Sequence, residues 1–440
     1  MALSGIQIYK LLPQTNCKEC GFPTCLAFAM KLAAKQVELA SCPYVSEESK
    51  TQLAESAAPP IRLVTLKSDG NEVKAGNEVV LYRHEKTFYN KPGIFIKLLD
   101  TEPVDAITAK VAAANAYIVN YVGIPLAVDG FAIEATSGDA AKFLLAVKAV
   151  RSATKRPLAL ISHQPTMMAE GLKGLNTGDA PLICGADSKN WEAMTELAKQ
   201  YKAVLSISTA SLDEMADLTE KIKSKGVEDL VLDPQADTLG GLLALNTQIR
   251  RLALKKNFRP LGYPVIAFPK TQAAATQAIA KYAGFVVLEE FTPELVYPLL
   301  VLRQNIYTDP QKPIQVQPGV YEINNPKPDS PVLVTTNFSI TYFSVANEVE
   351  GSGLPAWLVV CDAEGMSVLT AWAAGKFDAE RIAKSIKSFN LADKVSIKRV
   401  VLPGHVAVLS GELEEELSGW DIRVGPREAV DIPKFMKEAL

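Results

Sequence analysis

The stretch PLALISHQPTMMAEGLKGLNTGDAPLICGADSKNWEAMTELAKQYKAVLSIST, residues 157–209, decides the fold of this 440-residue chain. It contains three short apolar runs, PLALIS, APLICGA and AVLSIST, separated by two longer runs with apolar residues every three to four positions. The short runs predict strands that are buried on both faces, and the longer spacing predicts helices. Strands that alternate with helices in this way indicate a parallel sheet.

The same alternation extends outward on both sides, from about residue 61 to residue 315. After a leading segment around EVVLYRHEKTF, the strand-like runs are 93–99, 125–135, 157–162, 180–186, 203–209, 229–234, 264–269 and 284–290. The helical runs between them are 140–153, 166–175, 190–201, 211–226, 238–257 and 271–283, and an amphipathic segment at 293–307 closes the series. Eight such units favour a (β/α)8 TIM barrel, and an open doubly wound sheet is the alternative.

Four cysteines lie close together before the barrel, with the spacing C-x2-C-x4-C-x16-C. They are Cys17, Cys20, Cys25 and Cys42. Thiolates are soft ligands, and three of them on one loop with a distant fourth favour a [4Fe-4S] cluster. A structural zinc site and a Cys-x-x-Cys redox pair are the alternatives.

Helical runs at 6–12 and 24–40 flank the first three cysteines, so residues 1–57 predict a small helical domain. A domain this short builds little core alone, and a metal cluster would help to hold it together. The segment ESAAPP that follows predicts a linker. The remaining cysteines, Cys184 and Cys361, lie in apolar strand-like runs and are interpreted as small buried hydrophobic residues.

The last part of the chain predicts a second α/β domain. Residues 309–331 are rich in proline and poor in apolar residues, which predicts an interdomain linker. Strand-like and helical runs alternate again over residues 326–440. The sequence therefore predicts three domains, at 1–57, 61–315 and 326–440, the last an open Rossmann-like α/β domain.

The composition excludes several classes of protein. Lys and Arg number 46 against 49 Asp and Glu, and this balance indicates neither a nucleic-acid partner nor an anionic membrane surface. No uninterrupted apolar run is long enough to span a membrane, and the first residues do not form a secretory signal. We therefore expect a cytoplasmic protein, in which the cysteines stay reduced.

Several motifs together resemble one known family. They are NCKECGFPTCLAFAMKLA (16–33), SCPY (41–44), TTNFSITYFSV (335–345), LTAWAAGKF (369–377) and VGPREA (424–429). With the barrel-like middle, they resemble the large (gamma) subunit of corrinoid iron–sulfur proteins in the acetyl-CoA synthase/CO dehydrogenase system of the reductive acetyl-CoA pathway. The resemblance covers essentially the whole chain in order. The cysteine motif alone is less specific, because a similar module occurs in electron-transport subunits of the Rnf type.

The resemblance implies a methyl carrier, which is one component of a corrinoid-dependent methyltransferase system and acts with partner enzymes. Its cobalt corrinoid would accept a methyl group from methyltetrahydrofolate, with the help of a separate methyltransferase, and deliver it to acetyl-CoA synthase. The [4Fe-4S] cluster would relay the electron that restores Co(I) from Co(II). The implied partners also include a small (delta) TIM-barrel subunit in a heterodimer, and a reductive activator or ferredoxin.

Small and hydroxyl residues follow several strand-like runs of the C-terminal domain, at the edge where open α/β sheets bind flat cofactors. Candidate cofactor-binding residues from these positions are Asn337, Ala371, Gly404, Gly425, Pro426 and Arg427. The resemblance further implies corrin contacts from Thr336, Tyr342, Met366, Ser367, Val368, Leu369 and Ile432, with Thr370 near the lower face of the cobalt. Each of these residues has an alternative reading as an ordinary turn or cap residue.

The sequence around the histidines indicates that the protein supplies no histidine ligand to the cobalt. Many corrinoid proteins carry the motif Asp-x-His-x-x-Gly, but neither His84, His163 nor His405 has an aspartate two residues before it. The resemblance likewise implies a base-off corrinoid without a protein histidine ligand. No catalytic side chain is expected, because the chemistry would occur at the cobalt.

Two other functions remain open at this point. The first is an iron–sulfur electron-transfer subunit that binds no corrinoid. The second is a barrel methyltransferase that binds a folate itself. The loops that follow the barrel strands contain Asp233 and the pair Glu289–Glu290, which could be acids in a site or solvated loop residues. They form no persuasive constellation, and the barrel is interpreted as a scaffold.

Overall fold

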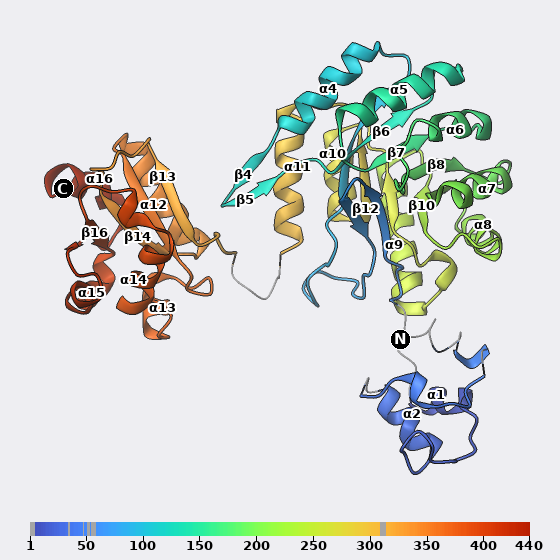
Figure 1. Cartoon of the computed structure of the whole chain (residues 1–440), viewed down its shortest axis with the longest axis horizontal. Helices are drawn as coiled ribbons and strands as arrows, with labels where there is room; N and C mark the ends of the chain where they lie inside the picture. The colour runs from blue at the N-terminus through green and yellow to red at the C-terminus, as the bar shows by residue number, and fades with distance from the viewer. Residues whose placement is uncertain (1–4, 34–35, 47, 51–52, 54–58, 309–313) are drawn as a thin grey trace. The chain divides into compact units, whose positions relative to one another are not determined.

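The computed structural model describes residues 5–33, 36–46, 48–50, 53, 59–308 and 314–440. Most of the predicted ESAAPP linker lies outside the described residues. Contacts between residues divide the chain into two compact units. The first unit contains residues 1–117 and 127–307, and the second contains residues 118–126 and 308–440. Figure 1 draws both units and labels many of their helices and strands.

The N-terminal part contains the helices α1 (Gly5–Leu11) and α2 (Cys25–Ala33) and the short 3-10 helix η1 (Leu39–Ser41). Helix α2 begins where the backbone N–H of Cys25 donates to Asn16 Oδ1 at 2.8 Å and that of Ala27 donates to Thr24 Oγ1 at 3.1 Å. These bonds satisfy amides that have no partner inside the helix. The predicted helix over 24–40 is wrong beyond Ala33, because residues 36–38 are not helical.

Eight parallel strands close into a barrel in the order of the sequence. They are β3 (Gly93–Leu99), β6 (Gly130–Glu134), β7 (Leu158–Ile161), β8 (Leu182–Ala186), β9 (Val204–Thr209), β10 (Leu230–Pro234), β11 (Val265–Ala267) and β12 (Ala283–Leu288). Each predicted run overlaps one of these strands. The predicted TIM barrel is therefore confirmed, and the open doubly wound sheet is wrong for this part of the chain.

Helices follow the barrel strands. They are α4 (Val104–Ala116), α5 (Ala140–Ala153), α6 (Pro165–Leu172), α7 (Trp191–Tyr201), α8 (Leu212–Ser224), α9 (Leu239–Lys256), η2 (Arg259–Leu261), α10 (Gln272–Ala280) and α11 (Pro293–Ile306). Hydroxyl or carboxylate caps accept the first amides of α5, α8, α9, α10 and α11, which explains where these helices begin. Helix α4 was not predicted, because alanine makes up much of its sequence and its apolar pattern is weak.

The predicted run 125–135 contains two different elements. Its second half is the barrel strand β6, whereas its first half belongs to β5 (Ile124–Leu126). Strand β5 pairs antiparallel with β4 (Val119–Tyr121), and this hairpin is part of the second unit. The prediction of one barrel strand over 125–135 is therefore wrong before residue 130.

A further hairpin, β1 (Val64–Ser68) with β2 (Asn71–Ala75), precedes the barrel and was not predicted. Its residues Val64, Leu66, Val73 and Ala75 pack with the side chains that fill the barrel interior. Val73 lies beside Gly93, the first residue of β3, so the hairpin covers the N-terminal end of the barrel. The leading segment around EVVLYRHEKTF forms neither a strand nor a helix.

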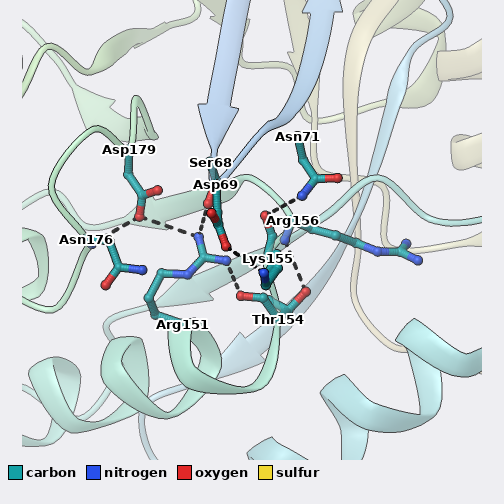
Figure 2. Close-up of polar contacts among 9 residues, drawn as sticks. All are labelled: Ser68, Asp69, Asn71, Arg151, Thr154, Lys155, Arg156, Asn176 and Asp179. Carbon is teal, nitrogen blue, oxygen red and sulfur yellow. Dashed lines mark hydrogen bonds and ion pairs between the residues drawn. The ribbon is translucent and has the colours of Figure 1, made fainter.

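A buried arginine joins this hairpin to the barrel (Figure 2). Arg151, at the end of α5, donates to Ser68 Oγ on β1 and to the backbone oxygen of Thr154. Its guanidinium also lies 3.5 Å from Asp179 Oδ2, and the side chains of Arg151 and Asp179 are 4% and 5% exposed. By contrast, Lys155 contacts Asp69 at 3.1 Å on the surface. Arg151 and Asp179 therefore form a buried pair of opposite charges at this end of the barrel, whereas Lys155 and Asp69 form an exposed one.

The second unit contains a five-stranded sheet in the order β13-β15-β14-β16-β17. Its strands are β13 (Gly319–Ile323), β14 (Val332–Thr336), β15 (Ala356–Cys361), β16 (Arg399–Leu402) and β17 (Asp421–Val424). Only β13 is antiparallel to its neighbour. This open α/β sheet confirms the predicted Rossmann-like fold. The linker prediction over 309–331 is wrong at 319–323, where β13 forms, and residues 309–313 lie outside the described residues.

Helices cover both faces of this sheet. They are α12 (Ser339–Ser352), α13 (Val368–Ala373), α14 (Ala379–Ser388), η3 (Leu391–Asp393), η4 (Gly404–Leu409), α15 (Ser410–Glu416), η5 (Ala429–Asp431) and α16 (Ile432–Glu438). Helices α12 and α16 share one apolar cluster with the sheet, whereas α13, α14 and α15 share the other. The connections after β14 and β16 therefore leave on opposite faces, which makes this pair of strands a topological switch point. None of the helices in the described residues has the length and apolar character needed to span a bilayer.

Candidate functional site

Three of the four clustered cysteines belong to one small apolar core, or pack against it. Cys25 and Cys42 are buried among Ile8, Leu12, Phe28 and other apolar side chains, and Cys20 packs against them. Cys17 is exposed on the loop. Tyr44, two residues after Cys42, donates to Glu19 Oε1 at 2.8 Å and so connects the loop to the segment that carries the last cysteine.

The loop around Cys17 has an unusual backbone, since Gln14, Asn16, Lys18 and Gly21 all have positive φ. Asparagine and glycine tolerate positive φ better than other residues, so Asn16 and Gly21 relieve part of the strain of this path. In the described part of this module, no three Cys, His, Asp or Glu side chains converge closely enough to hold a metal ion. The donor set of four free thiols in one apolar module nevertheless fits cluster chemistry.

A cavity of about 350 Å³ opens at the carboxyl ends of β14 and β16. Its floor includes Thr335 from β14, and Leu402 and Pro403 from the end of β16. Helices α12 and α16 form one wall, and the segments after β15 and β17 form the rest. This is the switch point of the sheet, where open α/β domains bind their ligands.

Seven of the fourteen predicted cofactor-binding residues line this cavity. They are Ser367, Val368, Leu369, Gly425, Pro426, Arg427 and Ile432. The structure thus brings together residues from two separate segments, after β15 and after β17. Gly425 has no room for a side chain, because a Cβ atom there would lie 2.8 Å from Val401 Cγ1.

The other predicted residues lie beside the cavity or inside the protein. Asn337 is buried and accepts from the amides of Ala363 and Gly365, so it shapes the loop after β15. Gly404 allows close contact between backbones, since a Cβ atom there would lie 2.6 Å from the oxygen of Gly425. The remaining five, which do not line the cavity, are Thr336, Tyr342, Met366, Thr370 and Ala371.

These five residues have identifiable local contacts. Thr370 Oγ1 lies 3.0 Å from Ser367 Oγ at the start of α13. Tyr342 packs against Tyr321, with 5.0 Å between the ring centroids. Met366 packs against the apolar cluster on the α14 face of the sheet, and Thr336 and Ala371 are fully buried.

Four residues of helix α12 form a wall of the cavity that was not predicted from the sequence. Ile340, Thr341, Ser344 and Val345 line it, and His405 lines the opposite side near Glu428, with 3.8 Å between Nε2 and Oε1. The spacing of the four α12 residues is one helical face, which is a signal that the sequence contains. That face could not be assigned to a ligand, because an apolar helical stripe more often faces a core.

Two buried hydroxyls at the end of β14 have no partner. Thr335 Oγ1 and Thr336 Oγ1 accept and donate no hydrogen bond, although both residues are completely buried. Buried polar groups are normally paired, and an unpaired one in a ligand cavity is a candidate contact. Of the two residues, Thr335 lines the cavity, so its unpaired hydroxyl is the candidate contact.

The carboxyl end of the barrel carries a second set of polar groups. Lys97 Nζ lies 3.0 Å from Glu134 and 2.6 Å from Glu289. Burial alone would lower the pKa of Lys97, but the two carboxylates outweigh it and raise that pKa. Asp233 is buried at the end of β10, and burial raises its pKa to about 7. Because Lys97 contacts the carboxylates of both Glu134 and Glu289, Glu289 is a paired residue rather than a free acid.

The last two cysteines are buried, as predicted. Cys184 and Cys361 are 2% and 1% exposed. Burial raises the pKa of the Cys361 thiol to about 12 and that of Cys184 well above its ordinary value. Both thiols therefore stay protonated and unreactive.

The fold and the cavity define the class of this protein: a TIM barrel combined with an open α/β ligand-binding domain and a cysteine-rich module. A family described as "CO dehydrogenase/acetyl-CoA synthase delta subunit" matches residues 63–436, and one described as "Putative Fe-S cluster" matches residues 12–44. The chain belongs to the family of corrinoid/iron–sulfur protein large subunits and acetyl-CoA decarbonylase/synthase gamma subunits.

Its similarity to these relatives extends over the full length. The chain is 45% identical to the corrinoid/iron–sulfur protein large subunit of Moorella thermoacetica, with 100% of both chains covered. It is 34% identical to the acetyl-CoA decarbonylase/synthase complex subunit gamma of Archaeoglobus fulgidus, covering 99% of this chain and 98% of the other. The corresponding protein of Methanopyrus kandleri is 32% identical, with the same coverage.

Solved structures that match the chain include dihydropteroate synthases. The enzyme from Thermus thermophilus is 18% identical, with 55% of this chain and 97% of that chain covered and a TM-score of 0.37. The enzyme from Yersinia pestis is 12% identical, with 56% and 100% covered and a TM-score of 0.39. Scores this low carry no argument about a ligand or a reaction.

Proposed function

We propose that this chain is the cofactor-carrying methyl-transfer component of an acetyl-CoA synthase system. The observation that carries the proposal is the cavity at the switch point between β14 and β16, which gathers seven predicted cofactor-binding residues. Its support comes from full-length similarity to a protein named a corrinoid/iron–sulfur protein large subunit.

In this proposal the cavity holds part of a cobalt corrinoid. When bound, the corrinoid would supply the cobalt that accepts a methyl group from methyltetrahydrofolate, through a methyltransferase, and delivers it to acetyl-CoA synthase. A cavity of about 350 Å³ is near the lower limit for a small-molecule site, so it would take one portion of so large a cofactor. Thr335 Oγ1 would donate to that portion, and Gly425 would let the ligand approach the backbone.

The residues Met366–Thr370 would lie under the corrin ring, with Thr370 near the lower face of the cobalt. No aspartate–histidine pair of the usual ligating motif is present, so the cobalt would stay base-off without a protein histidine ligand. His405 lines the cavity and has Glu428 as its neighbour, which suits contact with polar side chains of the cofactor.

Cys17, Cys20, Cys25 and Cys42 would hold the [4Fe-4S] cluster, which would supply the single electron that reactivates oxidised cobalt. Ligating thiols must be deprotonated and reduced, so we expect the protein to work in the cytoplasm. Cys25 and Cys42 are buried, and the apolar side chains around them would exclude water from one side of the cluster.

The proposal divides the work among three parts of the chain. Residues 1–57 hold the cluster, residues 61–315 form the scaffold, and the domain predicted over 326–440, preceded by β13, holds the corrinoid. The expected partners are the small (delta) TIM-barrel subunit, the methyltransferase, acetyl-CoA synthase and a reductive activator or ferredoxin. The barrel suits a scaffold role, since Lys97 pairs with both Glu134 and Glu289 at its carboxyl end.

The iron and cobalt contents of anaerobically prepared full-length protein test the proposal. About four iron atoms and one cobalt per chain are expected. Cys20→Ala should lose iron and keep cobalt, and Ser344→Trp should fill part of the cavity and lose cobalt while keeping iron. Ser388→Trp is the matched control, because Ser388 is also an exposed helical serine that bonds to its own helix. Iron without cobalt in the native protein would instead support the electron-transfer subunit.

A further inference from the structure

The tip of the β4–β5 hairpin has a strained backbone. Val122 has a φ of 48° and Gly123 has a φ of 82°. A two-residue hairpin turn with two positive φ values is of type I′, which strongly favours asparagine followed by glycine. Valine is branched at Cβ, and a positive φ is a true outlier for such a residue. Contacts of this valine must therefore offset the strain.

Those contacts lie within the second unit, to which the hairpin belongs. Val122 packs against the apolar cluster on the α12 face of the sheet. Its backbone oxygen accepts from the N–H of Gln317 at 3.2 Å. Gly123 fits so closely that a Cβ atom there would lie 2.5 Å from Tyr321 Oη. The turn is thus held against the segment that leads into β13.

Tyr321 connects the turn to α12. Its Oη donates to the backbone oxygen of Gln317 at 2.7 Å, and its ring lies 5.0 Å from the ring of Tyr342 on α12. Burial, and then the neighbouring Tyr342, raise the pKa of Tyr321 to about 12, so its hydroxyl remains a donor. Helix α12 in turn contributes four residues to the cavity wall, Ile340, Thr341, Ser344 and Val345.

We propose that Val122 is a positioning residue for the cofactor cavity. The chain segment between the barrel strands β3 and β6 supplies this residue, which fixes Tyr321 and, through it, the α12 wall. Asparagine would suit the turn better, but it would replace the apolar contact with a polar side chain. The inference rests on the proposed function of the cavity. It adds that a segment lying between two barrel strands in the sequence helps to support the cofactor site.

The experiment compares three variants of the full-length chain. Val122→Asn keeps a residue that favours the turn and removes the apolar contact, whereas Val122→Ile keeps that contact. Ile386→Val removes one buried methylene from the opposite face of the sheet, away from the cavity, and serves as the control for general destabilisation. Two properties are measured: the affinity for aquocobalamin, followed by its absorbance, and the exchange rate of the α12 amide hydrogens in protein without corrinoid.

We expect Val122→Asn to bind aquocobalamin about tenfold more weakly and to exchange its α12 amides about tenfold faster. Val122→Ile should resemble the native protein in both measurements, and Ile386→Val should bind with native affinity. Native exchange and native affinity in Val122→Asn would overturn the inference, as would an equal loss of affinity in Ile386→Val. If the native protein binds no corrinoid, the proposed function fails, and α12 exchange alone still decides the role of Val122.

Discussion

Replacing Arg151 with methionine tests the buried contact between the β1–β2 hairpin and the barrel (Figure 2). Methionine keeps the apolar stem and removes the charge. The change deletes the bonds to Ser68 Oγ and to the Thr154 oxygen. It also leaves the carboxylate of Asp179, only 5% exposed, without a cation nearby. Breaking a buried ion pair by removing one partner lowers the free energy of unfolding by about 3–5 kcal/mol, and we expect Arg151→Met to lower it by that amount.

Lys155→Met is the matched control in the same cluster. The Lys155–Asp69 pair is also an ion pair, at 3.1 Å, but its side chains are 77% and 54% exposed. Exposed pairs contribute about 0–1 kcal/mol, because water screens them and the long side chains lose entropy. The two substitutions therefore remove the same formal charge from sites that differ in burial.

The assay is amide hydrogen exchange of β1, β2 and β7, because segment-resolved exchange separates the barrel unit from the second unit. Arg151→Met combined with Asp179→Asn should recover part of the loss, since the isolated buried charge is then absent. A loss below about 1 kcal/mol in Arg151→Met, equal to that of Lys155→Met, would refute the reasoning. No recovery in the double variant would show that the uncompensated carboxylate is not the source of the cost.

Three further substitutions have expected outcomes. Thr335→Val removes an unpaired buried hydroxyl, so it should raise the free energy of unfolding of the ligand-free protein by about 1 kcal/mol. It should also weaken corrinoid binding, and unchanged binding would exclude this hydroxyl as a contact. Burial raises the pKa of Asp233 from 3.8 to about 7, so the folded state favours the protonated carboxyl. The free energy of unfolding therefore falls as the pH rises between these two values. Asp233→Asn should therefore exceed native stability at pH 8 by up to roughly 4 kcal/mol and match it near pH 4, and equal melting temperatures at pH 8 would contradict the expectation. His405→Ala should leave the Co(II) EPR spectrum of the loaded protein unchanged, and a changed axial signal would make His405 a ligand.

Local patterns predicted the elements whose environment is uniform along the chain. Each barrel strand is buried on both faces by its neighbours, so its apolar run is visible without knowing the partners. The helices that follow show their apolar stripe and often a capping residue such as Asp139 or Thr292. The cysteine spacing is equally local. Helix α4 was missed because alanine packs well and yet gives a weak apolar signal.

The hairpins and β13 were harder to predict, because their partners are distant in the sequence. Strand β5 lies next to β6 in the chain and merges with it into one apolar run, although the two strands belong to different units. Strand β13 lies in a proline-rich segment and is an edge strand, where few ladder bonds are needed. The strained turn at Val122 contradicts the local preference of valine, and this residue packs instead against an apolar cluster formed by distant segments.

The sequence by itself determined the barrel, the cysteine module and the family, and seven of the fourteen residues that it predicted to bind a cofactor line the cavity. Only the tertiary structure decided that α12 forms a cavity wall, that Asn337 supports a loop, and that the β4–β5 hairpin packs with the second unit. The physical reason is the same in each case. A sequence pattern records how much of a side chain is buried and on which face of its element, but the neighbour that buries it is set by how distant segments pack together.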